Sequence, residues 1–455
     1  MRILLATAAA IAPLTVAAGA HAQQVISTAR TTPIATATAT GTAPDSVRIA
    51  SGGSVAVTSG AAVTLNSSHT VDIDNGGSVT MTNAADGATG VLANGGNSGS
   101  VLIGGAINIT DSINQADYKD ADGDGDLDGP FAAGTDRYGV RVVGAAPLTG
   151  DVRIESGATI SVEGNQSGGV YIGAPLTGSL QNLGTITTIG DANYGVRTVG
   201  DVSGNVEILG AVTATGAGAT GVSLEGDTGG QVKIQGAVSA TGYRYTTPPQ
   251  PKPTTGTVPN EALFLEDLDA DDLLQGGPAV AIAGNATRGV VLDRAPAYGS
   301  GGVEGDDDGD NVKNGDEDDD GDGTINRNDT DRDGDGILDA SESTAALTSL
   351  GGAPALQIGS ASQTVNLGAA GSGDSAYGLI NRGTITASGL YADVDARAVQ
   401  LGVTGGQAVS IAGGFRNEGT IAAAALKADA TAVAALSNTS APALVNTGSI
   451  QSAVT

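Results

Sequence analysis

Aspartate residues at regular spacing mark one stretch of the chain as a candidate site for chemistry. Between residues 331 and 342, carboxylates occupy loop positions 1, 3, 5, 9 and 12, glycine occupies position 6 and an apolar residue occupies position 8. Calcium takes six to eight oxygen ligands around one point, glycine permits the sharp bend, and a final glutamate can supply two oxygens. The pattern therefore predicts a calcium-binding loop.

Two further loops precede this one in the same frame, so that the three loops begin at residues 306, 318 and 331. The first is defective, because Asn311 replaces the glycine of position 6. The predicted ligands are Asp306, Asp308, Asp310, Asn314 and Glu317 in the first loop, Asp318, Asp320, Asp322, Asn326 and Asp329 in the second, and Asp331, Asp333, Asp335, Asp339 and Glu342 in the third.

No paired helices flank these loops, which sets them apart from an EF-hand domain. Their arrangement resembles thrombospondin type 3 repeats, in which tandem aspartate loops wrap a string of calcium ions. The resemblance covers residues 306–342 and implies calcium as the bound metal. The alternative is a disordered acidic linker, because runs of like charge are usually solvated; the repeated spacing of Gly and Asp favours calcium.

The charge of this segment supports the same prediction. Residues 303–342 contain 17 acidic and 3 basic side chains, a net charge of −14 within a chain total of −29. Such a segment repels itself and stays open unless cations neutralise it. We therefore expect calcium to fold it.

A shorter version of the pattern lies earlier in the chain, with predicted ligands Asp120, Asp122, Asp124 and Asp128 and with Gly125 at position 6. Phe131 falls at position 12, so another group or water must complete the shell. We predict one calcium here, against the alternative of an exposed acidic turn. The acidic residues between 267 and 272 lack a glycine, and there a solvated linker is favoured.

The elements that must carry these loops follow a repeat. Residues 194–216 and 220–242 contain the same three runs, G-V-x, V-x-I and A-V-x-A, at an offset of 26. Upstream, apolar-x-apolar triplets recur every eight residues from Val47 to Met81, and three such beats nearly match one long unit. Units of three short strands cannot bury their apolar faces alone and must stack. The sequence thus predicts an all-β, right-handed parallel β-helix over residues 46–455.

Three insertions interrupt this repeat, at about 111–136, 243–278 and 293–354, and the second contains the run PPQPKP. Each is followed by a strand that we assign to the start of a coil, so we expect all three to leave the rod at one corner. A second motif, N-x-G-(T/S)-I, begins at Asn182, Asn381, Asn417 and Asn446. We attribute it to a corner at which Asn and Gly adopt positive φ.

The N-terminus predicts export. Arg2, an apolar run from Ile3 and the small residues Ala20 and Ala22 are typical of a signal peptide over residues 1–22, with a retained anchor as the alternative. We interpret residues 23–45 as an Ala/Thr-rich lead-in. With no cysteine the chain forms no disulfide, and its acidity argues against nucleic acid as a partner.

The Gly/Ala/Thr/Val-rich repeat behind a signal peptide resembles passenger regions of bacterial autotransporters and related cell-surface β-helix adhesins, over roughly residues 46–455. That resemblance implies a rod on the outer membrane of a Gram-negative bacterium, exported through a C-terminal β-barrel. The chain ends inside a repeat without alternating membrane strands, so we expect either a fragment or another route of anchoring.

Three hypotheses of function remain open. The first is a non-enzymatic surface protein whose calcium-bound insertions contact an unknown ligand on a host, a matrix or a neighbouring cell. The second is a secreted polysaccharide-degrading enzyme; however, Arg141 and Arg197 take equivalent places in different coils, as do Tyr138 and Tyr194, which favours a side-chain stack over a substrate-binding row. The third is a self-associating filament or surface-layer subunit.

Overall fold

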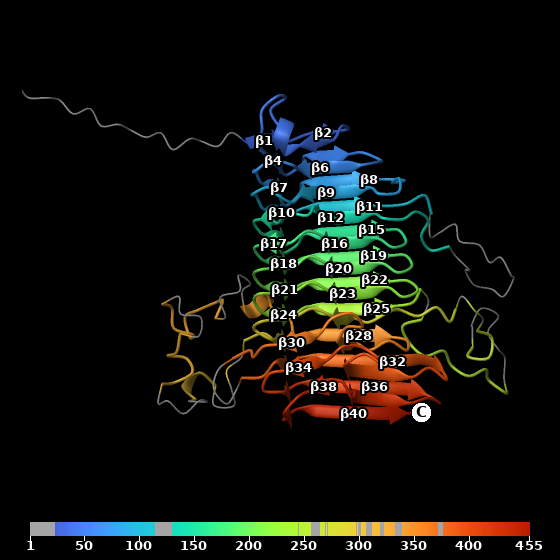
Figure 1. Ribbon diagram of the computed structural model, residues 1–455. Helices are drawn as coiled ribbons and strands as arrows, with labels where there is room; N and C mark the ends of the chain where they lie inside the picture. The colour runs from blue at the N-terminus through green and yellow to red at the C-terminus, as the bar shows by residue number, and fades with distance from the viewer. Residues whose placement is uncertain are drawn as a thin grey trace, which may run out of the picture.

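The chain forms a rod of stacked coils in the computed structural model (Figure 1). The structure describes residues 23–113, 130–243, 245–255, 264–268, 270, 272–296, 298, 302–305, 312–318, 323–332, 339–371 and 376–455. Successive strands do not pair with each other; each pairs in parallel with the corresponding strand of the next coil, which produces three long sheets. This confirms the predicted parallel β-helix.

Each sheet takes one strand from each coil. Sheet A contains β1 (Gln23–Ile26), β4 (Ser46–Ile49), β7 (Val71–Ile73), β10 (Val101–Ile103), β14 (Val152–Ile154), β18 (Leu180–Asn182), β21 (Val206–Ile208), β24 (Val232–Ile234), β27 (Val290–Leu292), β31 (Leu379–Asn381), β35 (Phe415–Asn417) and β39 (Leu444–Asn446). Sheet B contains β2 (Ala29–Arg30), β5 (Ser54–Ala56), β8 (Ser78–Met81), β11 (Ala106–Ile109), β15 (Thr159–Glu163), β19 (Thr185–Ile189), β22 (Ala211–Thr215), β25 (Ala237–Thr241), β28 (Ala346–Leu350), β32 (Thr384–Ala392), β36 (Thr420–Leu426) and β40 (Ser449–Val454). Sheet C contains β3 (Ile34–Ala35), β6 (Ala61–Leu65), β9 (Thr89–Asn94), β12 (Tyr138–Val143), β16 (Gly168–Ile172), β20 (Tyr194–Thr198), β23 (Thr220–Leu224), β26 (Val280–Ile282), β29 (Leu356–Ile358), β33 (Ala396–Leu401) and β37 (Ala430–Ala435).

Short elements fill the remaining corners. They are β13 (Leu148–Thr149), β17 (Leu176–Thr177), β30 (Val365–Leu367), β34 (Val409–Ile411) and β38 (Thr439–Ser440), with the 3-10 helices η1 (Thr36–Thr38), η3 (Gly302–Glu304) and η4 (Asp339–Ser341).

The repeat in the sequence is the pairing register of the rod. Val206 of β21 lies opposite Val232 of β24, which is the offset of 26 residues, and both side chains are buried. Side chains alternate across each strand, so the apolar members of every triplet point into one continuous core. Glycine opens the sheet C strand, since a Cβ atom on Gly195 would lie 2.6 Å from the carbonyl oxygen of Gly221.

The rod begins earlier than we expected. Residues 23–45 are not a lead-in: β1, β2 and β3 pair with β4, β5 and β6 and form a complete first coil. Short Ala- and Thr-rich strands carry too little hydrophobic contrast to show a period. Parallel pairing with the next coil nevertheless satisfies their backbone groups.

The insertions leave the rod at two corners, so the expectation of a single corner was wrong. The first connects β11 to β12 and the second connects β25 to β26, both from sheet B to sheet C. The third connects β27 to β28, from sheet A to sheet B, and projects on the other side of the rod (Figure 1). The error arose because β28 falls inside the range assigned to the third insertion, which ends before Ala346.

The asparagine motif is a core feature and not a turn of positive φ. Asn381 and Asn417 are fully buried at the ends of β31 and β35, and neither has positive φ. The Asn381 Nδ2 donates to Asn417 Oδ1 over 2.7 Å, and the Asn417 Nδ2 donates to Asn446 Oδ1 over 2.7 Å. Three coils are thus joined by an internal ladder of carboxamides.

Asn182 carries the same motif without the ladder. Its register neighbours are Ile154 and Ile208, and its side chain is 1% exposed. Neither carboxamide atom has a hydrogen-bond partner in the part of the chain that the structure describes. A buried polar group in this state costs stability, whereas a ladder member stabilises the rod.

These two asparagines provide a matched test of the ladder. We expect Asn417→Leu to lower the free energy of unfolding by about 2 kcal/mol, because it leaves Asn381 and Asn446 without their partner. We expect Asn182→Leu to leave the free energy of unfolding unchanged or to raise it by about 1 kcal/mol. Urea denaturation of both variants measures the difference, and equal destabilisation would contradict the assignment.

Candidate metal centre

The three predicted loops of the third insertion close in the same way. In each, the backbone N–H of position 9 donates to the carbonyl of the residue before position 1: Asn314 to Gly305 over 2.8 Å, Asn326 to Glu317 over 2.7 Å and Asp339 to Thr330 over 2.8 Å. A tight turn accompanies each closure, at Lys313–Asp316 and again at Ile325–Asn328. The described backbone therefore follows the spacing of 12 and 13 residues at which the carboxylates recur.

The loops are also stacked on one another. The Gly315 N–H donates to Val303 O, and the Arg327 N–H donates to Gly315 O, each over 3.0 Å. Asn314 and Asn326 are 5% and 3% exposed. The Asn326 Nδ2 donates to Asn314 O over 2.8 Å, and the Asn314 Nδ2 donates in the same way to Gly302 O over 3.0 Å. The position-9 carboxamides therefore join consecutive loops through their nitrogens.

The second loop shows the bend expected of a metal-binding loop. Gly323, at position 6, has φ of +94°, which glycine adopts without strain. Its N–H donates to Asp318 Oδ2, at position 1, over 3.0 Å. This bond turns the first carboxylate toward the inside of the loop, where ligands must converge.

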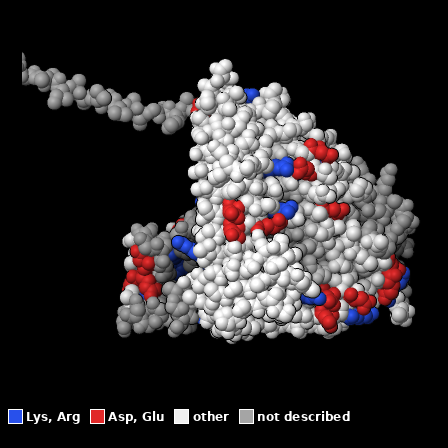
Figure 2. Space-filling view, viewed as in Figure 1, with Lys and Arg blue, Asp and Glu red and all other residues white. Residues whose placement is uncertain are grey.

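The basic side chains of the segment are already paired with carboxylates. Arg327 Nη2 lies 2.6 Å from Asp316 Oδ1, and Lys313 forms an ion pair with Glu304. Hydrogen bonding to Lys313 lowers the pKa of Glu304 below its ordinary value. Most of the negative charge of residues 303–342 therefore has no basic side chain of the segment to neutralise it. Described acidic side chains gather on this projecting lobe (Figure 2).

Two predicted ligands of the third loop hold the insertion in place. The Asp339 Oδ2 accepts from Arg332 Nε over 2.5 Å, and the Arg332 guanidinium lies 4.3 Å from the centre of the Tyr298 ring. Glu342 accepts a hydrogen bond from the side chain of Gln235, at the corner between β24 and β25. The sequence frame did not show the roles of Arg332, Tyr298 and Gln235, because each depends on contacts between distant segments.

A second anchor joins the start of the insertion to the coils below. Arg382 Nη1 lies 3.0 Å from Asp293 Oδ1, and Arg382 Nε lies 3.3 Å from Glu418 Oε2. The Ser343 hydroxyl donates to Gln235 O over 2.9 Å at the other end of the insertion. Both ends of the lobe are therefore fixed to the rod.

The remaining predicted ligands lie outside the described residues. These are Asp306, Asp308, Asp310, Asp320, Asp322, Asp333 and Asp335 of the third insertion, and Asp120, Asp122, Asp124 and Asp128 of the first. Asp329 is described, and its Oδ1 accepts from the Asp331 N–H over 2.9 Å. Among the described residues alone, no three acidic, histidine or cysteine side chains converge on one point. Calcium ligation therefore stays a prediction.

The first insertion is closed by a buried carboxylate at its base. Asp111 is 5% exposed, and its side chain accepts from the N–H of Ile113 over 2.6 Å and from the N–H of Ala133 over 2.5 Å. Arg137 lies 3.7 Å from this carboxylate, and Glu163 Oε2 accepts from the Asp111 N–H over 3.0 Å. This cluster fixes the ends of the segment that contains residues 120–128.

Phe131, which falls at position 12 of the predicted loop in the first insertion, has another role. Its ring stacks on Tyr243 of the second insertion with centroids 4.0 Å apart and planes 18° apart. The Tyr243 hydroxyl donates to Asp191 Oδ1 over 2.7 Å. The first two insertions therefore contact each other beside the same corner.

The arginines of sheet C form the expected side-chain stack. Arg141 lies 4.3 Å from the centre of the Tyr138 ring, and Arg197 lies 4.5 Å from that of Tyr194. Each guanidinium also meets a carboxylate, Asp136 at 3.1 Å and Glu225 at 2.7 Å. Burial raises the pKa of Tyr138 to about 12, so this phenol stays neutral at ordinary pH.

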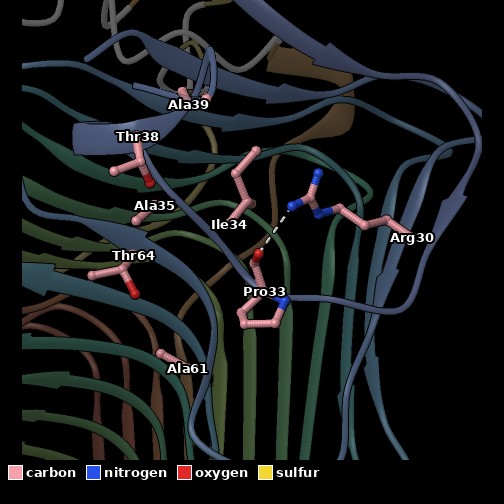
Figure 3. Close-up of a pocket in the computed structure, with 9 residues that line it drawn as sticks. Arg30, Pro33, Ile34, Ala35, Thr38, Ala39, Ala61 and Thr64 are labelled. Atoms are coloured by element: carbon pink, nitrogen blue, oxygen red, sulfur yellow. Dashed lines mark hydrogen bonds between the residues drawn. The ribbon is translucent and has the colours of Figure 1, made fainter. Parts of the chain in front are cut away.

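A pocket of about 520 Å³ lies beside the first coil (Figure 3). Ile34 and Ala35 of β3 line it together with Ala61 and Thr64 of β6. The Arg30 guanidinium at its rim donates to the carbonyls of Thr32 and Pro33, over 2.8 and 3.1 Å. Its hydrogen-bonding capacity is thus partly used within the chain.

Comparison with known protein families, with curated proteins and with solved structures finds no match to this chain. Within the described residues there is no helix of the length and apolarity that crossing a bilayer requires.

The base of the first insertion yields a pH prediction. Burial raises the pKa of Glu163 above its ordinary value, with a further contribution from the Asp111 carboxylate. The folded protein therefore holds this proton more tightly than the unfolded chain, and stability falls as pH rises through the folded pKa. Glu163→Gln should make unfolding less dependent on pH in this window and increase stability above it. Urea midpoints across the range measure this; a variant that is less stable than wild type at neutral pH would contradict it.

Proposed function

We propose that the chain is an exported, non-enzymatic β-helical protein of the adhesin or autotransporter-passenger type. The rod presents insertions that contact a ligand on a host, a matrix or a neighbouring cell, and calcium folds the third insertion. The observation that carries the calcium proposal is the closing hydrogen bond that recurs at Asn314, Asn326 and Asp339. The predicted signal peptide over residues 1–22, which lies outside the described residues, supports export.

Calcium supplies what the segment lacks. Three loops stack closely while residues 303–342 carry a net charge of −14, and like charges at such spacing oppose folding. Divalent cations bound between the carboxylates remove this repulsion and add coordination energy. Calcium bound at residues 306–342 would then stabilise the projecting lobe without changing the coils that support it.

Removal of calcium should open the lobe selectively. In the presence of a chelator, we expect a protease to cut within residues 303–342 while the coils before β27 and after β28 stay intact, because the coils are held by backbone pairing. Mass spectrometry of the fragments, with and without added calcium, locates the cuts. An identical cleavage pattern in both conditions would exclude the calcium proposal.

Neighbouring aspartates of the second loop provide a matched pair of variants. Asp318→Asn removes the position-1 charge, and we expect it to weaken calcium binding by about tenfold, or about 1.4 kcal/mol. Asp319→Asn removes the same charge from position 2, which is not a ligand position in the frame, and should have a smaller effect. Calorimetric titration of both variants compares them, and equal losses would show that net charge alone governs affinity.

The contact role needs a separate test. The exported protein, displayed on cells with the third insertion present or deleted between Asp293 and Ala345, is assayed for adhesion to host cells and extracellular matrix. We expect calcium-dependent adhesion that the deletion abolishes. Adhesion that survives the deletion would place the contact elsewhere, and release of oligosaccharides from polysaccharide substrates would overturn the non-enzymatic assignment.

A further inference from the structure

A proline-rich run on the second insertion has no role in the proposed function. Residues 248–253 read Pro-Pro-Gln-Pro-Lys-Pro. Proline fixes φ near −65°, and a residue before proline is confined to extended backbone. All six residues are proline or precede proline. The sequence therefore restricts the run to polyproline II, which has three residues per turn and a rise of about 3.1 Å per residue.

One side of this run is attached to the insertion. Pro249 is buried. Lys252, one polyproline turn further along, places Nζ 2.8 Å from Asp267 Oδ1 and donates its backbone N–H to Glu266 Oε2 over 2.7 Å. The Leu265 N–H donates to Gln250 O over 3.0 Å. The attachment of residues three apart agrees with the threefold period and holds the run in one conformation.

A second side of the run faces solvent. Pro248 and Pro251 are both exposed, and with three residues per turn they share one side at a separation of about 9 Å. Because the run is restricted by its prolines and fixed by its anchor, little conformational entropy remains to be lost on binding. Pyrrolidine rings at this spacing fit a groove lined with aromatic rings.

We infer that residues 248–253 form a docking strip for a partner domain with an aromatic-lined, proline-binding groove. The rim of that groove carries basic side chains, since Glu266 and Asp267 flank the strip and the whole chain has a net charge of −29. Pro248 and Pro251 enter the groove, while Pro249 and Lys252 keep the strip on the insertion. This surface is independent of calcium.

The test uses the full exported chain and two purified probes, an SH3 domain and a WW domain, both of which bind proline-rich segments through aromatic grooves. We expect saturable binding of at least one probe, with and without chelator, and weaker binding as salt rises. The double variant Pro248→Ala/Pro251→Ala should lose about tenfold or more in affinity. Pro253→Ala, on another side of the run, should change affinity by less than about twofold.

Circular dichroism and urea unfolding verify that each variant keeps the fold of the parent chain. Lys252→Ala frees the anchor without altering the two docking prolines, and it should weaken binding because the strip must then be ordered on association. Absence of binding by both probes, or binding that the double variant leaves unchanged, would overturn the inference.

Discussion

Parallel backbone pairing between coils is the interaction on which the rest of this structure depends. Each strand of three to six residues is too short to be stable alone, yet it pairs with the coil before and the coil after it, and its apolar side chains enter one shared core. Pairing leaves no freedom along the strands. Variation in length is therefore confined to the corners, and all three insertions occur there.

The corners in turn determine what the insertions can do. The first and second insertions leave from sheet B to sheet C and contact each other through Phe131 and Tyr243, whereas the third leaves from sheet A to sheet B. The rod therefore presents two separate lobes. One is acidic and held at its base by Gln235 and Arg382; the other carries a fixed proline-rich strip.

Local patterning was sufficient to predict the repeat, because apolar triplets and their spacing state the register directly, as at Val206 and Val232. The frame of the three loops was also visible in the sequence, and the closures at Asn314, Asn326 and Asp339 recur at its spacing. Contacts between coils were not predictable in this way. The motif at Asn417 indicated a turn, yet its side chain lies in the core and pairs with carboxamides 36 residues before it and 29 after it. The corner of the third insertion was missed because β28 is a weakly patterned strand, and the role of Gln235 depends on a partner 107 residues away.

The central claim is that a cation-dependent lobe is built on a cation-independent rod. Hydrogen–deuterium exchange followed residue by residue, with calcium and with chelator, tests it most directly. The account predicts that the amides of Asn314, Asn326 and Asp339 are protected only when calcium is present, while the strand amides of Val206 and Val232 are protected in both conditions. Equal protection of the three loop amides in both conditions would contradict it, as would loss of strand protection on chelation.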